Sequence, residues 1–326
     1  MKRIVTFYVV VFTLTIGFAF GLIYPLYNKA AQGLVSQSVV VMSLSMMMFI
    51  PSVAVILTRL ITREGFRNAN FKPVNFRQTF RYYLLAWFGP ALLTALGAVV
   101  YFLINPSDFD PSMSTMVSSL QNQVTDLGAS DITDQAARFM LILQLSVGAF
   151  ISPLINFVFC LGEEWGWRGY VFPKINERLS FVPSVLLTGV LWGLWHAPVT
   201  VIGHNYGLDY SGFPYLGIVA MCCFCTVLGV FFSYLTVRSK SCIPAALAHG
   251  SMNGFAGASA LFSVSGGNPF IGPLPTGLIG GSAFIVVALI ICLCMKNAPL
   301  WMSQVPEGAP GDTEAPPDAT KASSQA

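Results

Sequence analysis

Charged residues are scarce in this chain. Asp, Glu, Lys and Arg make up 10% of its 326 residues, whereas apolar residues make up 55%. A soluble globular domain carries about a quarter charged residues. The composition therefore excludes a soluble globular protein and predicts an all-α protein that crosses a membrane several times. No basic patch with interleaved aromatic side chains is present, so we expect no nucleic-acid partner.

Several patterns that carry chemistry in other proteins are also missing. There is no HExxH helix of a zinc peptidase and no glycine-rich phosphate loop after a strand. None of the seven cysteines shares a short polar loop with another, which argues against a disulfide framework. The run Cys222-Cys223-Phe224-Cys225 fits buried packing groups on a helix better than a metal cluster. Ser, Cys and Lys show no arrangement typical of an activated nucleophile.

Long apolar runs, by contrast, recur along the chain. A spanning helix needs about 20 mostly apolar residues. The first run is long for the apolar part of a signal peptide, so we interpret it as a span. About eight transmembrane helices are predicted, over residues 4–24, 39–61, 82–104, 139–161, 183–202, 214–236, 243–262 and 275–295.

The loops between these runs differ in charge. The loop after the second run is basic and the loop after the third is acidic. The basic loop contains Arg59, Arg63, Arg67, Lys72, Arg77 and Arg81, and the acidic loop contains Asp108, Asp110, Asp126, Asp131 and Asp134. By the positive-inside rule the basic loop is cytoplasmic, and counting onward places both termini in the cytoplasm. We expect a multi-pass protein of the plasma membrane, with a short helix outside the bilayer over 113–127.

Two adjacent glutamates, Glu163 and Glu164, close one of the apolar runs. Ionisable groups at membrane depth are expensive and are therefore candidates for a functional site. Glu164 and Arg168 are four residues apart and can pair on one helix face. Glu163 points about 100° away around the helix, so it is free for a different role, such as that of a general base. The alternative is a charged helix end flanked by interfacial tryptophans.

The histidines form the other candidates. His196 lies deep in an apolar run, with Trp192 one turn earlier as a possible wall of the same pocket. His249 and Asn253 are four residues apart, so both face one side of a helix and could donate hydrogen bonds to one developing oxyanion. The alternatives are a hydrogen-bonded structural histidine and polar contacts between helices. His204 falls in an outer loop, where we expect it to be solvated.

Together these clusters resemble the motif set of the CAAX protease and bacteriocin-processing (CPBP) family of intramembrane endopeptidases, also called the Abi or Rce type. The family pattern is EExxxR, FxxxH and HxxxN on successive membrane helices. The resemblance covers roughly residues 139–262, and Trp192 stands in place of the phenylalanine. The matching residues are Glu163, Glu164, Arg168, His196, His249 and Asn253.

The resemblance implies a CAAX prenyl protease-like hydrolase that cleaves a peptide bond in a membrane-associated protein or peptide, which is prenylated in eukaryotic relatives. Glu163 would activate a water that His196 holds. His249 and Asn253 would form the oxyanion hole, and Glu164 with Arg168 would orient the site. The chain then divides into N-terminal membrane helices, a catalytic core and a disordered cytoplasmic tail, over 1–138, 139–296 and 297–326.

Other interpretations stay open at this point. Glu163, His196 and His249 could hold a zinc ion with an open position, as in a metalloendopeptidase. We favour a site without cofactor, because Asn253 suits an oxyanion better than zinc. A non-catalytic bacteriocin-immunity or scaffold protein is an alternative of another class. A proton-coupled transporter is a third, although no internal repeat supports it.

The predicted site also sets a geometric condition. The expected spans put Glu163 at the cytoplasmic end of its helix, but His196 about 13 residues into the next, roughly 20 Å away along the axis. For the two to meet, the helix of Glu163 must extend past Arg168, or the helix of His196 must begin lower or tilt.

Overall fold

The computed structural model describes residues 2–301, except 67, 68, 127 and 129. Across these residues the secondary structure is helical, with two isolated β-bridges and no strand. The predicted all-α, polytopic membrane protein is thereby confirmed. The predicted tail from 302 onward lies outside the described residues.

The N-terminal part folds into seven α-helices with a π-helical and a 3-10 segment between them. They are α1 (Lys2–Phe18), η1 (Ala19–Ile23), α2 (Tyr24–Ala31), α3 (Gln37–Met47), α4 (Ile50–Ile61), α5 (Phe76–Ile104), η2 (Pro106–Asp108), α6 (Ser114–Asp126) and α7 (Asp134–Phe150). Helix α6 confirms the short helix expected over 113–127.

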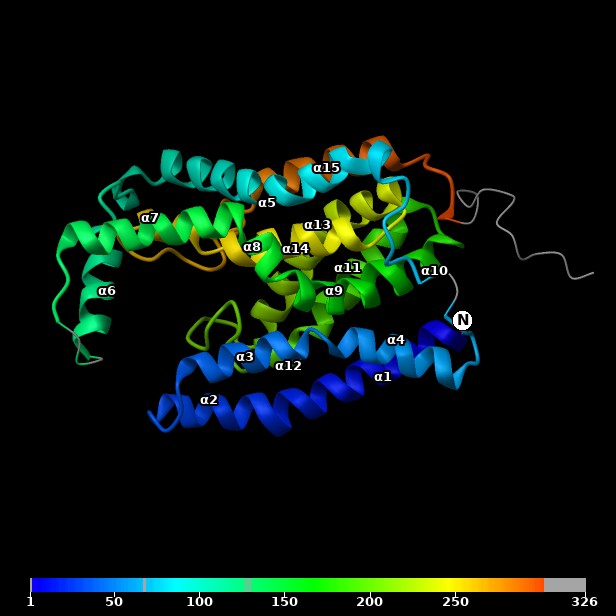
Figure 1. Cartoon of the computed structure of the whole chain (residues 1–326), viewed down its shortest axis with the longest axis horizontal. Coiled ribbons are helices and arrows are strands. Elements are labelled where there is room, and N and C mark those ends of the chain that lie inside the picture. The colour runs from blue at the N-terminus through cyan, green and yellow to red at the C-terminus, as the bar shows by residue number, and fades with distance from the viewer. Residues whose placement is uncertain (1, 67–68, 127, 129, 302–326) are drawn as a thin grey trace, which may run out of the picture.

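The remaining helices surround the candidate site. They are α8 (Ser152–Ile155), α9 (Phe157–Gly166), η3 (Trp167–Val171), α10 (Phe172–Asn176), α11 (Phe181–Trp195), α12 (Ala197–Thr200), α13 (Tyr215–Ser239), α14 (Ile243–Phe255), η4 (Ala258–Phe262) and α15 (Ser282–Met295). In Figure 1, α9, α11 and α14 lie at the centre, between the layer of α5 and α15 and the layer of α1 to α4.

Four helical stretches are long and apolar enough to cross a membrane: 2–31, 37–61, 76–104 and 215–239. The other predicted spans are built from shorter helices. The run 139–161, for example, breaks into α7, α8 and α9, with Pro153 in the first turn of α8. A proline lacks the N–H that would continue the preceding helix, so the chain turns there. Apolar length alone does not reveal such breaks.

Close packing fixes the core helices against one another. Gly189 and Gly193 of α11 lie against α13, and a Cβ at Gly193 would come within 2.3 Å of the Cα of Cys222. The two backbones approach more closely than any side chain would allow. Such small residues let membrane helices associate without a hydrophobic driving force.

The charged loops lie at opposite ends of the molecule. In Figure 1 the N-terminus, the loop after α4 and helix α10 share one end, whereas α6 and the loop after α5 share the other. This is the separation of basic from acidic loops that the positive-inside rule requires. The cytoplasmic position of the basic end stays a prediction.

Candidate active site

The two glutamates lie in the middle of a longer helical stretch. Helix α9 continues through η3 into α10 and ends at Asn176. Glu163 therefore lies 13 residues before that end, about 20 Å at 1.5 Å per residue. His196 lies 15 residues after the start of α11 at Phe181, about 22 Å. The two residues share a depth because the helix of Glu163 extends past Arg168.

Glu163 is buried, with 1% of its surface exposed. Its Oε1 accepts a hydrogen bond of 2.6 Å from the indole Nε1 of Trp192 on α11. A phenylalanine at this position could not donate such a bond. Trp192 is thus more than the pocket wall expected from the sequence: it holds the carboxylate directly.

Glu164 faces a different set of partners, as the one-residue offset on the helix predicts. It pairs with Arg168 one turn later, at 3.0 Å between Nη1 and Oε2. Its Oε1 also lies 2.8 Å from Nδ1 of His249 on α14. Glu164 therefore joins α9 to α14. Burying a carboxylate is costly unless it has charged or polar partners, and Glu164 has two.

Arg168 completes this network on its other side. Its guanidinium stacks over the ring of Trp192, 3.9 Å from the centroid, and lies 5.4 Å from that of Phe232 on α13. Gly229 makes room for it, since a Cβ there would lie 3.1 Å from Nη2. Lysine could not replace Arg168 here, because its ammonium group lacks the planar guanidinium that stacks on a ring and donates to a carboxylate at the same time.

His196 lies at the C-terminal end of α11. Its Nδ1 lies 3.0 Å from the backbone carbonyl of Trp192 and 3.7 Å from Sγ of Cys225. A bond to the carbonyl requires a proton on Nδ1, which leaves Nε2 as the acceptor in the neutral ring. The rings of Trp195 and His204 also contact His196, with centroids 4.7 Å and 6.4 Å away.

The predicted pair on α14 is only partly brought into this cluster. His249 is buried and contacts Glu164, and its ring lies 5.7 Å from that of Trp192. Asn253 is exposed, and its Nδ2 donates to Sγ of Cys160, 3.8 Å away. Cys160 precedes Glu163 by one helical turn, so Asn253 lies at the edge of the site.

His204 was expected to be solvated, but the structure packs its ring parallel to that of His196, at 5° between planes. Burial in this loop lowers the pKa of His204 to about 4. The sequence signal that could have indicated this is the rarity of histidine, because His204 is one of only three in the chain. His204 joins the candidate site that the other two define.

A divalent ion would find three donors here. The ligand atoms of Glu163, Glu164 and His249 lie within 4.8 Å of one another. Two carboxylates and an imidazole are a donor set that suits zinc. The set expected from the sequence had His196 in place of Glu164. Binding through Glu164 would compete with its bonds to Arg168 and His249.

Comparison with known proteins bears on this region of the chain. Residues 142–255 match the family model described as type II CAAX prenyl endopeptidase Rce1-like. The matched region is Rce1-like. It contains all six residues of the three sequence motifs, so the resemblance inferred from them is confirmed there. A curated relative, CAAX prenyl protease 2 of Methanococcus maripaludis, is 41% identical over 44 residues, which span 14% of this chain and 16% of the relative.

Proposed function

We propose that this protein is an intramembrane endopeptidase that hydrolyses a peptide bond in a membrane-associated protein or peptide. One observation carries the proposal: Glu163, Glu164 and His249 form a single buried cluster within the Rce1-like region. Buried carboxylates are costly, and a purely structural role would not call for two side by side.

Peptide hydrolysis needs a water nucleophile, a base and stabilisation of charge at the carbonyl oxygen. In the proposed mechanism Glu163 takes the proton of a water that Nε2 of His196 holds. Trp192 fixes the Glu163 carboxylate through its indole N–H. The proton then passes from Glu163 to the leaving amine.

His249 and Asn253 would stabilise the oxyanion of the tetrahedral intermediate. The contact of His249 Nδ1 with Glu164 supports this role, because it fixes the ring and leaves Nε2 as the nitrogen that would donate to the oxyanion. Arg168 holds Glu164 in turn. Asn253 lies one helical turn beyond His249, where its amide can meet a substrate that enters from the exposed edge.

The substrate would be a membrane-associated protein or peptide of the plasma membrane, with or without a lipid group. Cleavage would fall near the C-terminus of that substrate. The Rce1-like match supports a CAAX-type substrate. In a metal-dependent version Glu163, Glu164 and His249 would hold a divalent ion, which would supply Lewis-acid activation of water. We favour the version without a metal, because Glu164 is already bonded to Arg168 and His249.

The test is cleavage of a library of membrane peptides, with and without a C-terminal prenyl group, by purified protein in detergent. Wild type and Glu163→Gln are compared, each with and without a strong chelator. Cleavage by wild type alone, unaffected by chelator, is the expected result. Loss with chelator and recovery with zinc would replace the proposed mechanism by the metal-dependent one.

If neither protein cleaves any peptide, the endopeptidase proposal fails and a non-catalytic scaffold becomes the better interpretation. In that case Glu163→Gln would also leave the cellular phenotype intact, whereas loss of the protein would not. A folding check by size-exclusion chromatography accompanies both arms, because Glu163 is buried.

A further inference from the structure

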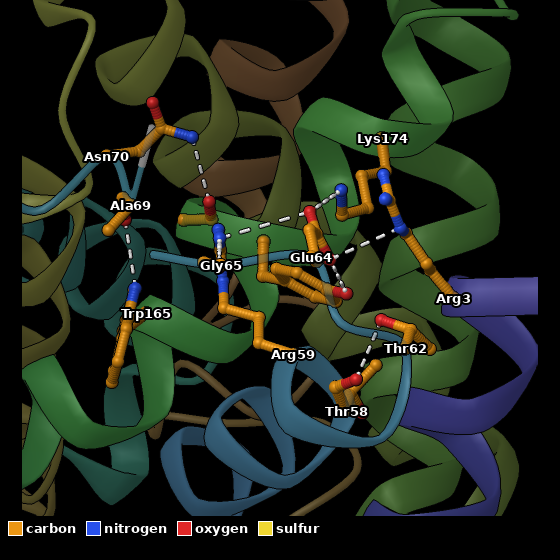
Figure 2. Close-up of polar contacts among 12 residues, drawn as sticks. Arg3, Thr58, Arg59, Thr62, Glu64, Gly65, Ala69, Asn70, Trp165 and Lys174 are labelled. Atoms are coloured by element: carbon orange, nitrogen blue, oxygen red, sulfur yellow. Dashed lines mark hydrogen bonds and ion pairs between the residues drawn. The ribbon is translucent and has the colours of Figure 1, made fainter. Parts of the chain in front are cut away.

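The loop between α4 and α5 contacts two helical segments of the candidate site. One is α9–η3, which carries the glutamates, and the other is α14, which carries His249. Its residue Asn70 donates a hydrogen bond of 2.9 Å from Nδ2 to the carbonyl of Gly169 in η3 (Figure 2). The backbone carbonyl of Asn70 accepts a hydrogen bond of 2.8 Å from the N–H of Cys242. Cys242 is the N-cap of α14. One residue outside the Rce1-like region thus links α9–η3 to α14.

Both groups that Asn70 binds lie where the regular α-helical hydrogen-bond pattern is interrupted, one in a π-helical turn and the other at a helix N-terminus. A π-helical turn shifts the hydrogen-bond register and disturbs the local ladder of carbonyl groups, and η3 begins three residues after Glu164. The first N–H groups of an α-helix have no partner inside that helix. Asn70 supplies a donor to the first helix and an acceptor to the second.

The link lies close to the catalytic contact. Gly169 follows Glu164 by five residues, and Cys242 precedes His249 by seven. A Cβ on Gly169 would lie 3.3 Å from Sγ of Cys242, so the two helices touch at this point. The 2.8 Å contact between Glu164 and His249 joins the same two helices at another point along their length. The spacing at Asn70 therefore bears on the spacing at the site.

Asn70 is itself held rigidly. Its φ of 56° lies in the left-handed region, which asparagine tolerates better than most residues. The preceding residue, Ala69, accepts a hydrogen bond of 2.9 Å from the indole of Trp165 on α9. Earlier in the loop, Glu64 binds Lys174 of α10 and the hydroxyl of Tyr170 (Figure 2). The loop is fastened to the catalytic helix on both sides of η3.

We infer that Asn70 is a positioning residue: it sets the separation of α9–η3 from α14 and thereby the alignment of Glu164 with His249. The inference rests on the proposed endopeptidase function. It assigns part of the catalytic geometry to the N-terminal half of the chain, outside residues 142–255.

The first test compares Asn70→Gly with Asn75→Gly. Glycine keeps the left-handed backbone and the carbonyl that binds Cys242, but removes the bond to Gly169. Asn75 is a matched control, because it is also left-handed, lies in the same loop and makes no side-chain cap bond. We expect kcat to fall about tenfold or more in Asn70→Gly, with KM within twofold, and Asn75→Gly to match wild type.

A second variant separates positioning from general loss of structure. Gly169→Cys in the Asn70→Gly background places a thiol next to Cys242, near disulfide distance, once the ring of Trp165, whose Cδ1 would lie 2.8 Å from the new Cβ, moves aside. Oxidation forms the disulfide from two thiols, with oxidised glutathione as the acceptor of their electrons and protons. We expect oxidation to restore at least half of the lost kcat and dithiothreitol to reverse the gain.

The outcomes separate the inference from the proposed function. Wild-type kcat in Asn70→Gly, or a loss of equal size in Asn75→Gly, would overturn the positioning role while cleavage itself stands. If wild type cleaves nothing, the rate of disulfide formation at Gly169→Cys still decides: the positioning role requires slower crosslinking in Asn70→Gly than with Asn70 present. Equal rates would overturn it.

Discussion

Trp192→Phe isolates the hydrogen bond that holds the proposed general base. The substitution keeps an aromatic ring at the position where the CPBP pattern has phenylalanine. It removes the indole N–H that lies 2.6 Å from Oε1 of Glu163. A smaller ring still lies beneath the guanidinium of Arg168, which stacks 3.9 Å from the indole. The variant therefore separates loss of the hydrogen bond from loss of the pocket wall.

The size of the effect follows from the partner's charge. A hydrogen bond to a charged group contributes about 1.5–3 kcal/mol. At about 1.4 kcal/mol per factor of ten, we expect kcat/KM to fall about 10- to 150-fold if the bond aligns the Glu163 carboxylate for proton abstraction. The reason is that a carboxylate freed from Trp192 can rotate away from the water it must activate.

Trp195→Phe is the matched control for this experiment. Trp195 lies on the same helix, is fully buried and donates its indole N–H over 2.6 Å to Oγ1 of Thr15. This hydrogen bond does not involve either glutamate, and phenylalanine keeps an aromatic ring beside His196. We therefore expect the kcat/KM of Trp195→Phe to stay within about threefold of wild type. Peptide cleavage in detergent, normalised to the monodisperse fraction, is the assay. Equal losses in both variants would refute a specific role for the Trp192 bond.

Three further predictions test neighbouring parts of the molecule. In Gly229→Ala the added methyl group meets Arg168 at 3.1 Å, so we expect a melting temperature several degrees lower and weaker cleavage, with unchanged values contradicting the tight fit. His204→Ala should lower kcat about two- to tenfold by releasing the ring of His196, and His204→Phe should restore it; equal activity of both would refute the stacking role. Partners of Glu64 hold its pKa below 4.5 although burial alone would raise it. Its stabilising contribution is therefore complete above pH 4.5 and is lost as the pH falls through the folded pKa, and Glu64→Gln should show a smaller loss of melting temperature on acidification from pH 6 to pH 3.

The sequence predicted the architecture well because membrane insertion leaves a strong compositional signal. Scarce charge and long apolar runs indicated a polytopic helical protein, and the structure agrees. The breaks within those runs were not foreseen, because they depend on how a helix ends. Pro153, at the start of α8, is one such point, and the π-helical turn after Glu164 is another. A hydropathy profile detects neither a proline break nor a π-helical turn.

The candidate site was predictable as far as helical spacing reaches. Residues four apart on one helix must share a face, so the pair Glu164–Arg168 followed directly from the sequence. Contacts between helices did not follow. The sequence around Trp192 does not predict its hydrogen bond to Glu163, and the sequence around His249 does not predict its contact with Glu164.

Asn70 marks the limit of such reasoning. Asn70 is an uncharged residue in a basic loop, and it belongs to no sequence motif. Its proposed role depends on contacts among three segments that are far apart in the sequence. Through these contacts the N-terminal half of the chain would take part in the proposed catalytic geometry. The Glu164 carboxylate and the His249 imidazole must be aligned closely to act together in a low-dielectric interior, and the two helices that carry them cannot fix their own separation. A loop bonded to both helices can do so, and the loop of Asn70 is bonded to both at the basic end of the bundle.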